Sequence, residues 1–214
     1  MKKLFSVLSV VFMSVLPLYA TEQDTVDRCA SIVRDFRRMP ERAIPHEVLR
    51  NARGLAIITV VKAGFIFSGK GGKGIVVART RHGWSGPSFI ATGGAGWGLQ
   101  AGAEVTDFLL VLNNRDAVRA FSRGTNVTLG ADASVAAGPV GRDAQVAIAP
   151  KAAIYSYSRT KGLFAGVSIE GAVIHTQQDA NRHYYGRPVT AAQILIGEVK
   201  PPPGAARLRA ALGR

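Results

Sequence analysis

Residues 62–103 constrain the fold more than any other stretch, because they combine many glycines with a strand-like alternation. Twelve of the 24 glycines of the chain lie there. From residue 91 to residue 106, small or apolar side chains hold the odd positions, and glycine, Thr, Gln or Glu hold the even ones. A period of two predicts a β-strand with one apolar face. Glycine weakens a strand entropically, so this many glycines predict a close approach of another backbone or a sharply coiled sheet.

A hairpin is predicted just before this alternating strand. Residues 55–61 are a continuous β-branched run, which predicts a buried strand. The apolar runs 64–68 and 75–79 flank the glycine-rich segment 69–74, which predicts a turn between two strands.

The glycine-rich segment also matches a nucleotide-binding pattern. Gly69-x-Gly71-x-x-Gly74 has the dinucleotide spacing, but it leads into a strand where that motif must open a helix. A Walker loop needs Ser or Thr after its lysine, and Gly74 follows Lys73. We therefore expect only an anion-binding concavity of glycine amides beside Lys70 and Lys73, with a plain flexible hairpin tip as the alternative.

Further strands and helices complete the predicted architecture. Strands are predicted at residues 107–112, 127–135, 153–158 and 163–173, and helices at residues 23–38, 45–52, 114–122, 191–196 and in the C-terminal part, with Asn114 and Thr190 as N-caps. The expected fold class is α+β. It has N-terminal helices, a strongly coiled, mainly antiparallel, glycine-rich sheet that is barrel- or sandwich-like, and short C-terminal helices. The helices and the low aromatic content disfavour an outer-membrane barrel.

The first 20 residues predict a cleaved signal peptide. Lys2 and Lys3 precede an apolar run, and a cleavage site follows at Ala20. A retained anchor is the alternative, although the apolar run is short for a membrane span. We divide the chain into a signal peptide (1–20), an amphipathic helix (21–40), a main domain (41–198) and a basic C-terminal tail or helix (199–214). The protein is expected to be periplasmic or secreted, with peripheral attachment to a membrane as an option.

The predicted helix at 23–38 carries the only cysteine, Cys29, so no internal disulfide forms. We expect Cys29 to be buried on the apolar face, with intermolecular pairing as the alternative. The helix itself is either an ordinary docking helix or an amphipathic helix whose basic end meets a membrane.

Charge points to an anionic partner. The formal net charge is +13, or +11 without Lys2 and Lys3, and residues 48–103 contain seven Lys or Arg and no Asp or Glu. Such an excess favours nucleic acid, acidic lipid or polyanionic glycan, and export disfavours nucleic acid. A solvated basic surface without a partner is the alternative. The predicted anion-binding residues in the glycine-rich stretch and a later turn are Lys62, Lys70, Lys73 and Arg142.

Catalytic and metal motifs are sparse. Ser158-x-x-Lys161 has no partner triplet, and the sequence has neither a G-x-S-x-G elbow nor an H-E-x-x-H motif. Each small-residue strand carries one carboxylate, and we take these three as candidates for a polar cluster: Glu104, Asp132 and Glu170. A hydrolase that uses them is a remote alternative. We expect a protein that is not an enzyme and has no cofactor and no metal.

Short motifs follow one another in a fixed order from residue 41 to residue 197. They include Ser68-Gly-Lys-Gly-Gly-Lys-Gly74, Trp84-Ser-Gly-Pro87, Gly96-Trp-Gly-Leu-Gln-Ala-Gly-Ala-Glu-Val-Thr-Asp107 and Tyr155-Ser-Tyr-Ser-Arg-Thr-Lys-Gly162. This succession resembles the SYLF domain family. The resemblance implies a mixed α and β domain with N-terminal helices. It also implies binding of phosphoinositide and other anionic lipids, and actin binding and bundling in eukaryotic members.

The resemblance adds a second set of candidate residues. Lipid contact in that family is attributed partly to a basic N-terminal amphipathic helix, and here the matching cations are Arg28, Arg34, Arg37 and Arg38. A signal peptide indicates an exported bacterial member, so the expected partner is anionic phospholipid or lipid phosphate, with actin disfavoured. The predicted function is a non-catalytic envelope module that binds anionic phospholipid. The alternative is a structural protein that binds an envelope protein.

Overall fold

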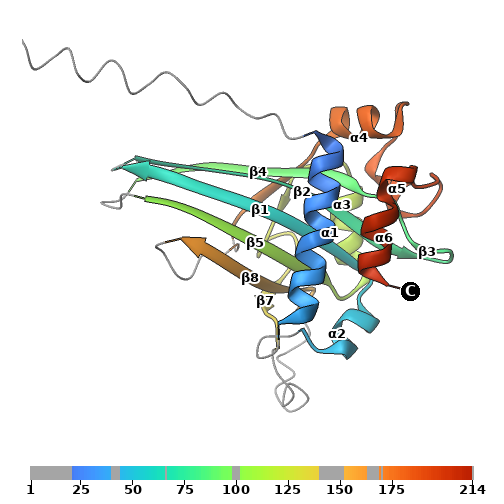
Figure 1. Ribbon diagram of the computed structural model, residues 1–214, viewed down its shortest axis with the longest axis horizontal. Coiled ribbons are helices and arrows are strands. Elements are labelled where there is room, and N and C mark those ends of the chain that lie inside the picture. The colour runs from blue at the N-terminus through green and yellow to red at the C-terminus, as the bar shows by residue number, and fades with distance from the viewer. Residues whose placement is uncertain are drawn as a thin grey trace, which may run out of the picture.

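The computed structural model describes residues 21–39, 44–65, 67–97, 102–139, 152–162, 169 and 171–213. A strongly curled sheet of nine strands carries helices on both faces (Figure 1). Its strands are β1 (Gly54–Phe65), β2 (Phe67–Thr80), β3 (Gly83–Trp84), β4 (Ser88–Trp97), β5 (Gly102–Leu112), β6 (Val127–Thr128), β7 (Val135–Ala137), β8 (Ile154–Gly162) and β9 (Val173–Thr176). The helices are α1 (Glu22–Arg38), α2 (His46–Asn51), α3 (Arg115–Ser122), α4 (Gln178–Tyr185), α5 (Ala191–Leu195), the 3-10 turn η1 (Pro203–Ala205) and α6 (Ala206–Leu212). The predicted α+β class is confirmed.

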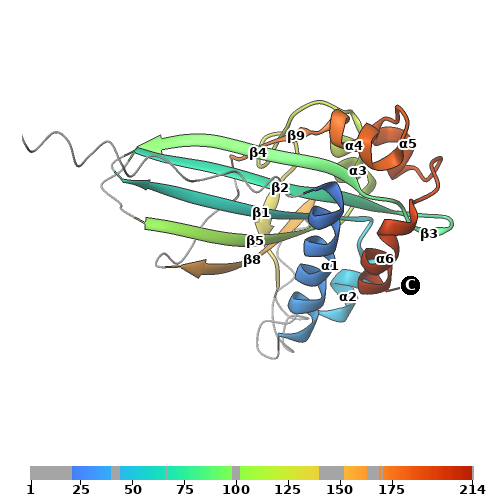
Figure 2. The same ribbon diagram turned by 45° about the horizontal axis from the view of Figure 1, so that its top comes forward.

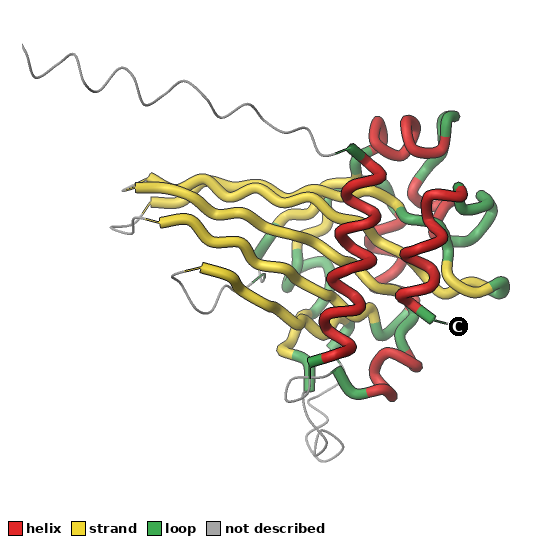
Figure 3. The backbone as a smooth tube through the Cα atoms, viewed as in Figure 1, coloured by secondary structure: helices red, strands yellow, loops and turns green. Residues whose placement is uncertain are grey.

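Two apolar cores lie on the two faces of the sheet. On one face, α1 and α6 pack against odd-numbered residues of the central strands, such as Ile57 and Leu109. On the other, α3 and α5 pack against even-numbered residues, such as Ile58 and Leu110. We call these the α1 face and the α3 face. At one end the long strands extend past all the helices, and we call this the projecting end (Figure 3).

The central hairpin turns earlier in the sequence than predicted. β1 and β2 pair from Gly54 with Ala78 to Phe65 with Phe67, so the two strands are joined well before residues 69–74. Residues 69–74, predicted as the turn, lie inside β2 and pair with β1 on one side and β4 on the other. The glycine amides therefore belong to a strand ladder, and the predicted anion-binding concavity and flexible tip are both wrong.

The predicted long strand at residues 91–106 is two strands. The sheet order is β6-β9-β4-β2-β1-β5-β8-β7, with β3 paired to β2, so β4 and β5 lie on opposite sides of the central hairpin. All neighbours are antiparallel except β7 and β8. In both β4 and β5 the odd-numbered residues lie on the α1 face and the even-numbered residues on the α3 face. The alternation in the sequence is therefore the same in the two strands and does not reveal that they are separate.

The predicted strand at residues 127–135 is also interrupted. Only its two ends are strand, in β6 and at the start of β7. Gly130 has a φ of 96°, and the Asp132 carboxylate accepts a hydrogen bond from the Thr128 amide, so this segment closes a turn. Of the predicted strand at 163–173, residues 163–168 and 170 lie outside the described part, and β9 begins at Val173.

Helix ends follow the predicted caps. Asn114 accepts a hydrogen bond from Ala117 at the start of α3, and Thr190 forms a capping box with Gln193 at α5. Thr21 forms a capping box with Asp24 at the start of α1. The apolar face of α1 is buried, and Cys29 is part of it, donating to the Ile57 carbonyl at 3.7 Å. The predicted burial of Cys29 is confirmed.

Gly74 provides a test of why the central strands need glycine. A Cβ on Gly74 would collide with the backbone carbonyl oxygen of Ile57, whereas a Cβ on Gly71 would meet nothing within 4 Å. We expect Gly74→Ala to lower the free energy of unfolding by about 1–3 kcal/mol, because the colliding atom is backbone. The matched variant Gly71→Ala should be neutral or stabilise by up to about 1 kcal/mol. Denaturant unfolding of both variants checks this, and equal losses would contradict it.

Thiol chemistry provides a test of how α1 docks. Burial raises the pKa of the Cys29 thiol to about 12. The native protein therefore holds this proton more tightly than the unfolded chain, and the resulting stability is lost as the pH rises above about 8.5, the pKa of a free thiol. Near pH 8 we expect a disulfide reagent to modify Cys29 only through unfolding, so the rate should rise steeply with denaturant. A native rate equal to that of free cysteine would show that α1 is not packed on the sheet.

Candidate functional site

The cations predicted to bind anions lie on both faces of the sheet. The residues of β1 and β2 alternate without a bulge, so Lys73 lies on the α1 face, and Lys62 and Lys70 lie on the α3 face. Lys62 and Lys70 lie opposite each other toward the β1–β2 turn, whereas Lys73 lies opposite Thr59, whose hydroxyl accepts a hydrogen bond from Arg28 of α1. Arg142 lies outside the described residues. The predicted set is therefore divided into separate surfaces.

Arg28 belongs to a charge network that ties α1 to the sheet. Its Nη2 lies 3.2 Å from Oδ1 of Asp107, and its Nε donates to the Thr59 hydroxyl at 2.8 Å. The Thr59 hydroxyl in turn donates to the same Asp107 oxygen at 2.7 Å. Only 4% of the Asp107 side chain is exposed, against 52% of Arg28. Arg28 thus neutralises a buried carboxylate.

Arg159 completes this network from the next strand. Its Nη2 donates to the second oxygen of Asp107 at 3.1 Å, and its Nη1 lies 2.9 Å from Asp35 on α1. Register places Thr59, Asp107 and Arg159 side by side on β1, β5 and β8. Arg28 and Asp35 of α1 therefore both contact this row of residues across β1, β5 and β8. The sequence marked Arg159 only as part of a failed S-x-x-K pattern, because its partners are distant in the chain.

The other α1 arginines lie toward the C-terminal end of that helix. Arg34 donates to the Ser31 hydroxyl at 2.9 Å, and Arg37 donates to the Ala211 carbonyl of α6 at 2.8 Å. Arg37 and Arg38 are exposed. Because the apolar face of α1 is buried in the core, only its polar face is available to a ligand. α1 is therefore a docking helix within the domain, and its arginines remain the candidates for surface binding.

Exposed arginines lie on α1, α2 and α6, at the start of β1 and in the turn between β2 and β3, all in the helix-bearing part of the molecule away from the projecting strands (Figures 1 and 2). We call these exposed residues the arginine face: Arg37, Arg38, Arg50, Arg53, Arg81 and Arg209. Within the described residues of α2, Glu47 pairs with Arg50 at 3.3 Å. Four of these arginines were not predicted as site residues, although three lie in or beside the acid-free stretch.

Of the predicted carboxylate cluster, the two described members, Glu104 and Asp132, have separate hydrogen-bond partners. Glu104 is 2% exposed on β5 and accepts a hydrogen bond from the Thr106 hydroxyl at 2.7 Å. Asp132 lies in the exposed turn after β6 and binds a backbone amide. Glu170 lies outside the described residues. The described residues include no group of three or more His, Cys, Asp or Glu placed to hold a metal ion.

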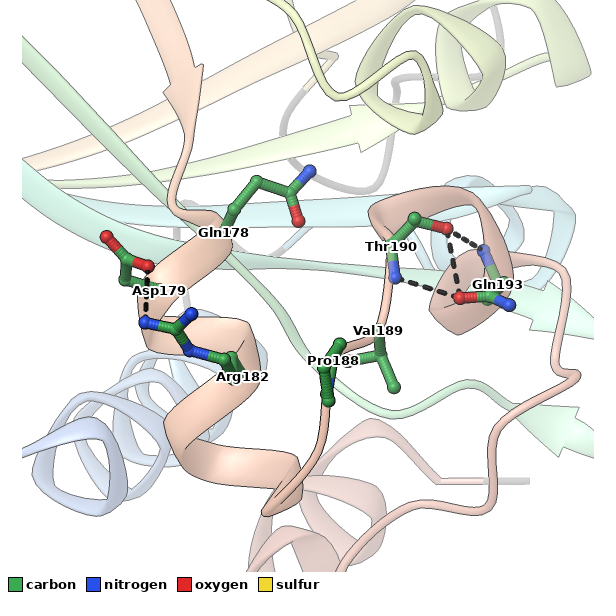
Figure 4. Close-up of a pocket in the computed structure, with 7 residues that line it drawn as sticks. All are labelled: Gln178, Asp179, Arg182, Pro188, Val189, Thr190 and Gln193. Carbon is green, nitrogen blue, oxygen red and sulfur yellow. Dashed lines mark hydrogen bonds and ion pairs between the residues drawn. The ribbon is translucent and has the colours of Figure 1, made fainter.

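One open pocket lies between α4 and the segment that leads into α5 (Figure 4). Its volume is about 290 Å³, and its polar lining is committed to local pairs. Asp179 and Arg182 form an ion pair at 3.0 Å, and Thr190 and Gln193 form the α5 capping box. No nucleophile with a neighbouring base lines it.

Among the described helices, none has the length and apolar character needed to cross a membrane.

Comparison with known proteins finds a matching family model and several similar proteins. A family model described as "Ysc84: Las17-binding protein actin regulator" matches residues 93–214. "LAS seventeen-binding protein 3" of Saccharomyces cerevisiae is 51% identical over 168 residues, which is 76% of this chain and 37% of that protein. "Protein YSC84" of the same yeast is 46% identical over 199 residues, or 88% of this chain and 42% of that protein.

A human relative extends the comparison. "SH3 domain-containing YSC84-like protein 1" of Homo sapiens is 41% identical over 194 residues, which is 87% of this chain and 57% of that protein. The chain thus spans between 37% and 57% of the length of these relatives.

The Asp107 network can be tested by removing its carboxylate. We expect Asp107→Ala to lower the free energy of unfolding by about 3 kcal/mol, because it removes the buried carboxylate that pairs with both Arg28 and Arg159. The control is Asp116→Ala, since the Asp116–Arg119 pair has exposed fractions of 81% and 71%. That loss should stay below about 0.5 kcal/mol. Chemical denaturation checks both, and equal losses would show that the network does not hold α1.

Proposed function

Because the chain belongs to the Ysc84 (SYLF) family, we propose that it is a non-catalytic binding module that docks its arginine face on anionic phospholipid. The observation that carries the proposal is the number of exposed arginines in the helix-bearing part of the molecule, where Glu47 of α2 pairs with Arg50.

The physics of a charged membrane fits this surface. A basic residue close to an anionic leaflet contributes about 1 kcal/mol, and the attraction fades within a Debye length of about 10 Å. Several residues must therefore reach the surface together. The arginine face supplies six, from segments that the fold brings to one end. The three lysines of β1 and β2 are divided, with Lys73 on one sheet face and Lys62 and Lys70 on the other. A flat membrane meets more cations at the arginine face.

A protein partner is the second candidate. The printed names of the relatives refer to Las17 binding and actin regulation, so a protein that presents acidic side chains is a natural alternative ligand for the same face. The expectation that actin is no partner rests on export. Residues 1–20 lie outside the described part, so export stays a prediction. The predicted export favours phosphatidylglycerol as the first lipid to test.

Paired charge reversals can separate the two basic regions. Arg38→Glu with Arg209→Glu changes the arginine face, and Lys70→Glu with Lys73→Glu changes the lysines of β2 by the same net charge. We expect the arginine pair to weaken binding to phosphatidylglycerol-containing phosphatidylcholine vesicles at least about tenfold, and the lysine pair to weaken it much less. Vesicle co-sedimentation at low and high salt measures this.

Three results would count against the proposal. The first is equal binding to pure phosphatidylcholine vesicles. The second is binding that salt does not weaken. The third is a larger loss in the lysine pair, which would move the site to the lysines of β2. Capture of one stoichiometric protein partner, without any dependence on lipid, would favour the second candidate.

A further inference from the structure

Arg79 stands in an environment unlike that of Arg159, which is also half-buried. It lies on β2 directly opposite Trp84 of β3, and its guanidinium carbon lies 4.4 Å from the centre of the Trp84 ring. Trp84 is only 5% exposed and packs in the core of the α1 face. The tryptophan therefore holds the guanidinium in place, which reduces the entropy that Arg79 would lose on binding a ligand.

The guanidinium has no anionic partner among the described residues. No hydrogen bond or ion pair joins its nitrogens to any of them, and both Arg79 Nε and Trp84 Nε1 are buried donors without an acceptor. Arg159 shows the contrast, because two carboxylates pair with its terminal nitrogens although its Nε also lacks an acceptor. A partly buried cation normally pairs with an anion, since desolvation without a partner is costly.

The surroundings of Arg79 are cationic. Its backbone amide donates to the Arg53 carbonyl at 2.8 Å, which places the start of β1 beside it. Arg53 and Arg81 are exposed, and residues 48–103 contain no Asp or Glu. The local field therefore attracts an anion from solution.

We propose that Arg79, fixed by Trp84 and assisted by Arg53, binds a phosphate group at the centre of the arginine face. The inference rests on the proposed lipid-binding function and names the residue that would seat the headgroup. A guanidinium presents parallel N–H donors that match two phosphate oxygens, which an ammonium group does not. Nε is buried, so the phosphate meets the terminal nitrogens. Arg79 fixes the position of the phosphate, and the exposed arginines attract it electrostatically.

Charge-conserving substitutions separate this site from general attraction. Arg79→Lys keeps the charge but removes the guanidinium fork, and Arg81→Lys makes the same change at an exposed neighbour. On phosphatidylcholine vesicles that contain phosphatidylglycerol, we expect Arg79→Lys to weaken binding about tenfold, and Arg81→Lys by less than about twofold. Thermal unfolding of each variant establishes that it is folded.

A second measurement leaves Arg79 unchanged. The chain has two tryptophans, so in a Trp97→Phe background Trp84 alone reports on the stack. Inorganic phosphate should change its fluorescence saturably, and sodium chloride at equal ionic strength should not.

The outcomes distinguish lipid phosphate from free phosphate. Loss of vesicle binding in Arg79→Lys alone supports the lipid headgroup as the ligand. Equal binding by Arg79→Lys and Arg81→Lys overturns the Arg79 site and leaves the proposed function standing. If the unmodified protein ignores the anionic vesicles, the proposed function fails. A saturable response of Trp84 to phosphate then identifies a site for free phosphate, and no response overturns this inference too.

Discussion

A single buried carboxylate determines how this domain presents its charge. Asp107 receives hydrogen bonds from two arginines and a threonine, and two residues of α1 take part in the network. Because α1 is held against the sheet, its apolar face belongs to the core and only its polar side meets solvent. The same network removes Arg28 from the cations available to a ligand. Internal pairing therefore decides which arginines can act outside the protein.

The remaining cations are distributed by the geometry of the sheet. Alternation places Lys73 on one face, and Lys62 and Lys70 on the other, so residues close in sequence are separated by the thickness of the sheet. The arginine face is built in the opposite way, from segments far apart in sequence that the fold brings to one end. A count of charges along the chain identified the acid-free stretch, but only the fold shows on which surfaces its Lys and Arg residues lie.

Local signals in the sequence were reliable and non-local ones were not. The caps at Asn114 and Thr190, the buried helix face with Cys29, and the α+β class all follow from short-range patterns. The central hairpin was misplaced because the glycines of β2 resemble a turn, whereas Gly74 is needed for close approach to the backbone of Ile57. Arg159 and Trp84 gain their roles from partners on other strands, and no pattern within a short window reveals such partners.

The pairing of α1 with α6 has a consequence for the order in which the protein folds. Gln23 donates to the Gly204 carbonyl and Arg37 to the Ala211 carbonyl, across 181 and 174 positions of the chain. The first helix of the domain to be synthesised thus completes its contacts only with the last. Contacts between such distant residues form slowly, because a long loop must close before they give any return. The nascent chain therefore keeps the part of α1 that α6 covers exposed until α6 has been synthesised, and apolar surface exposed during folding favours aggregation in that interval.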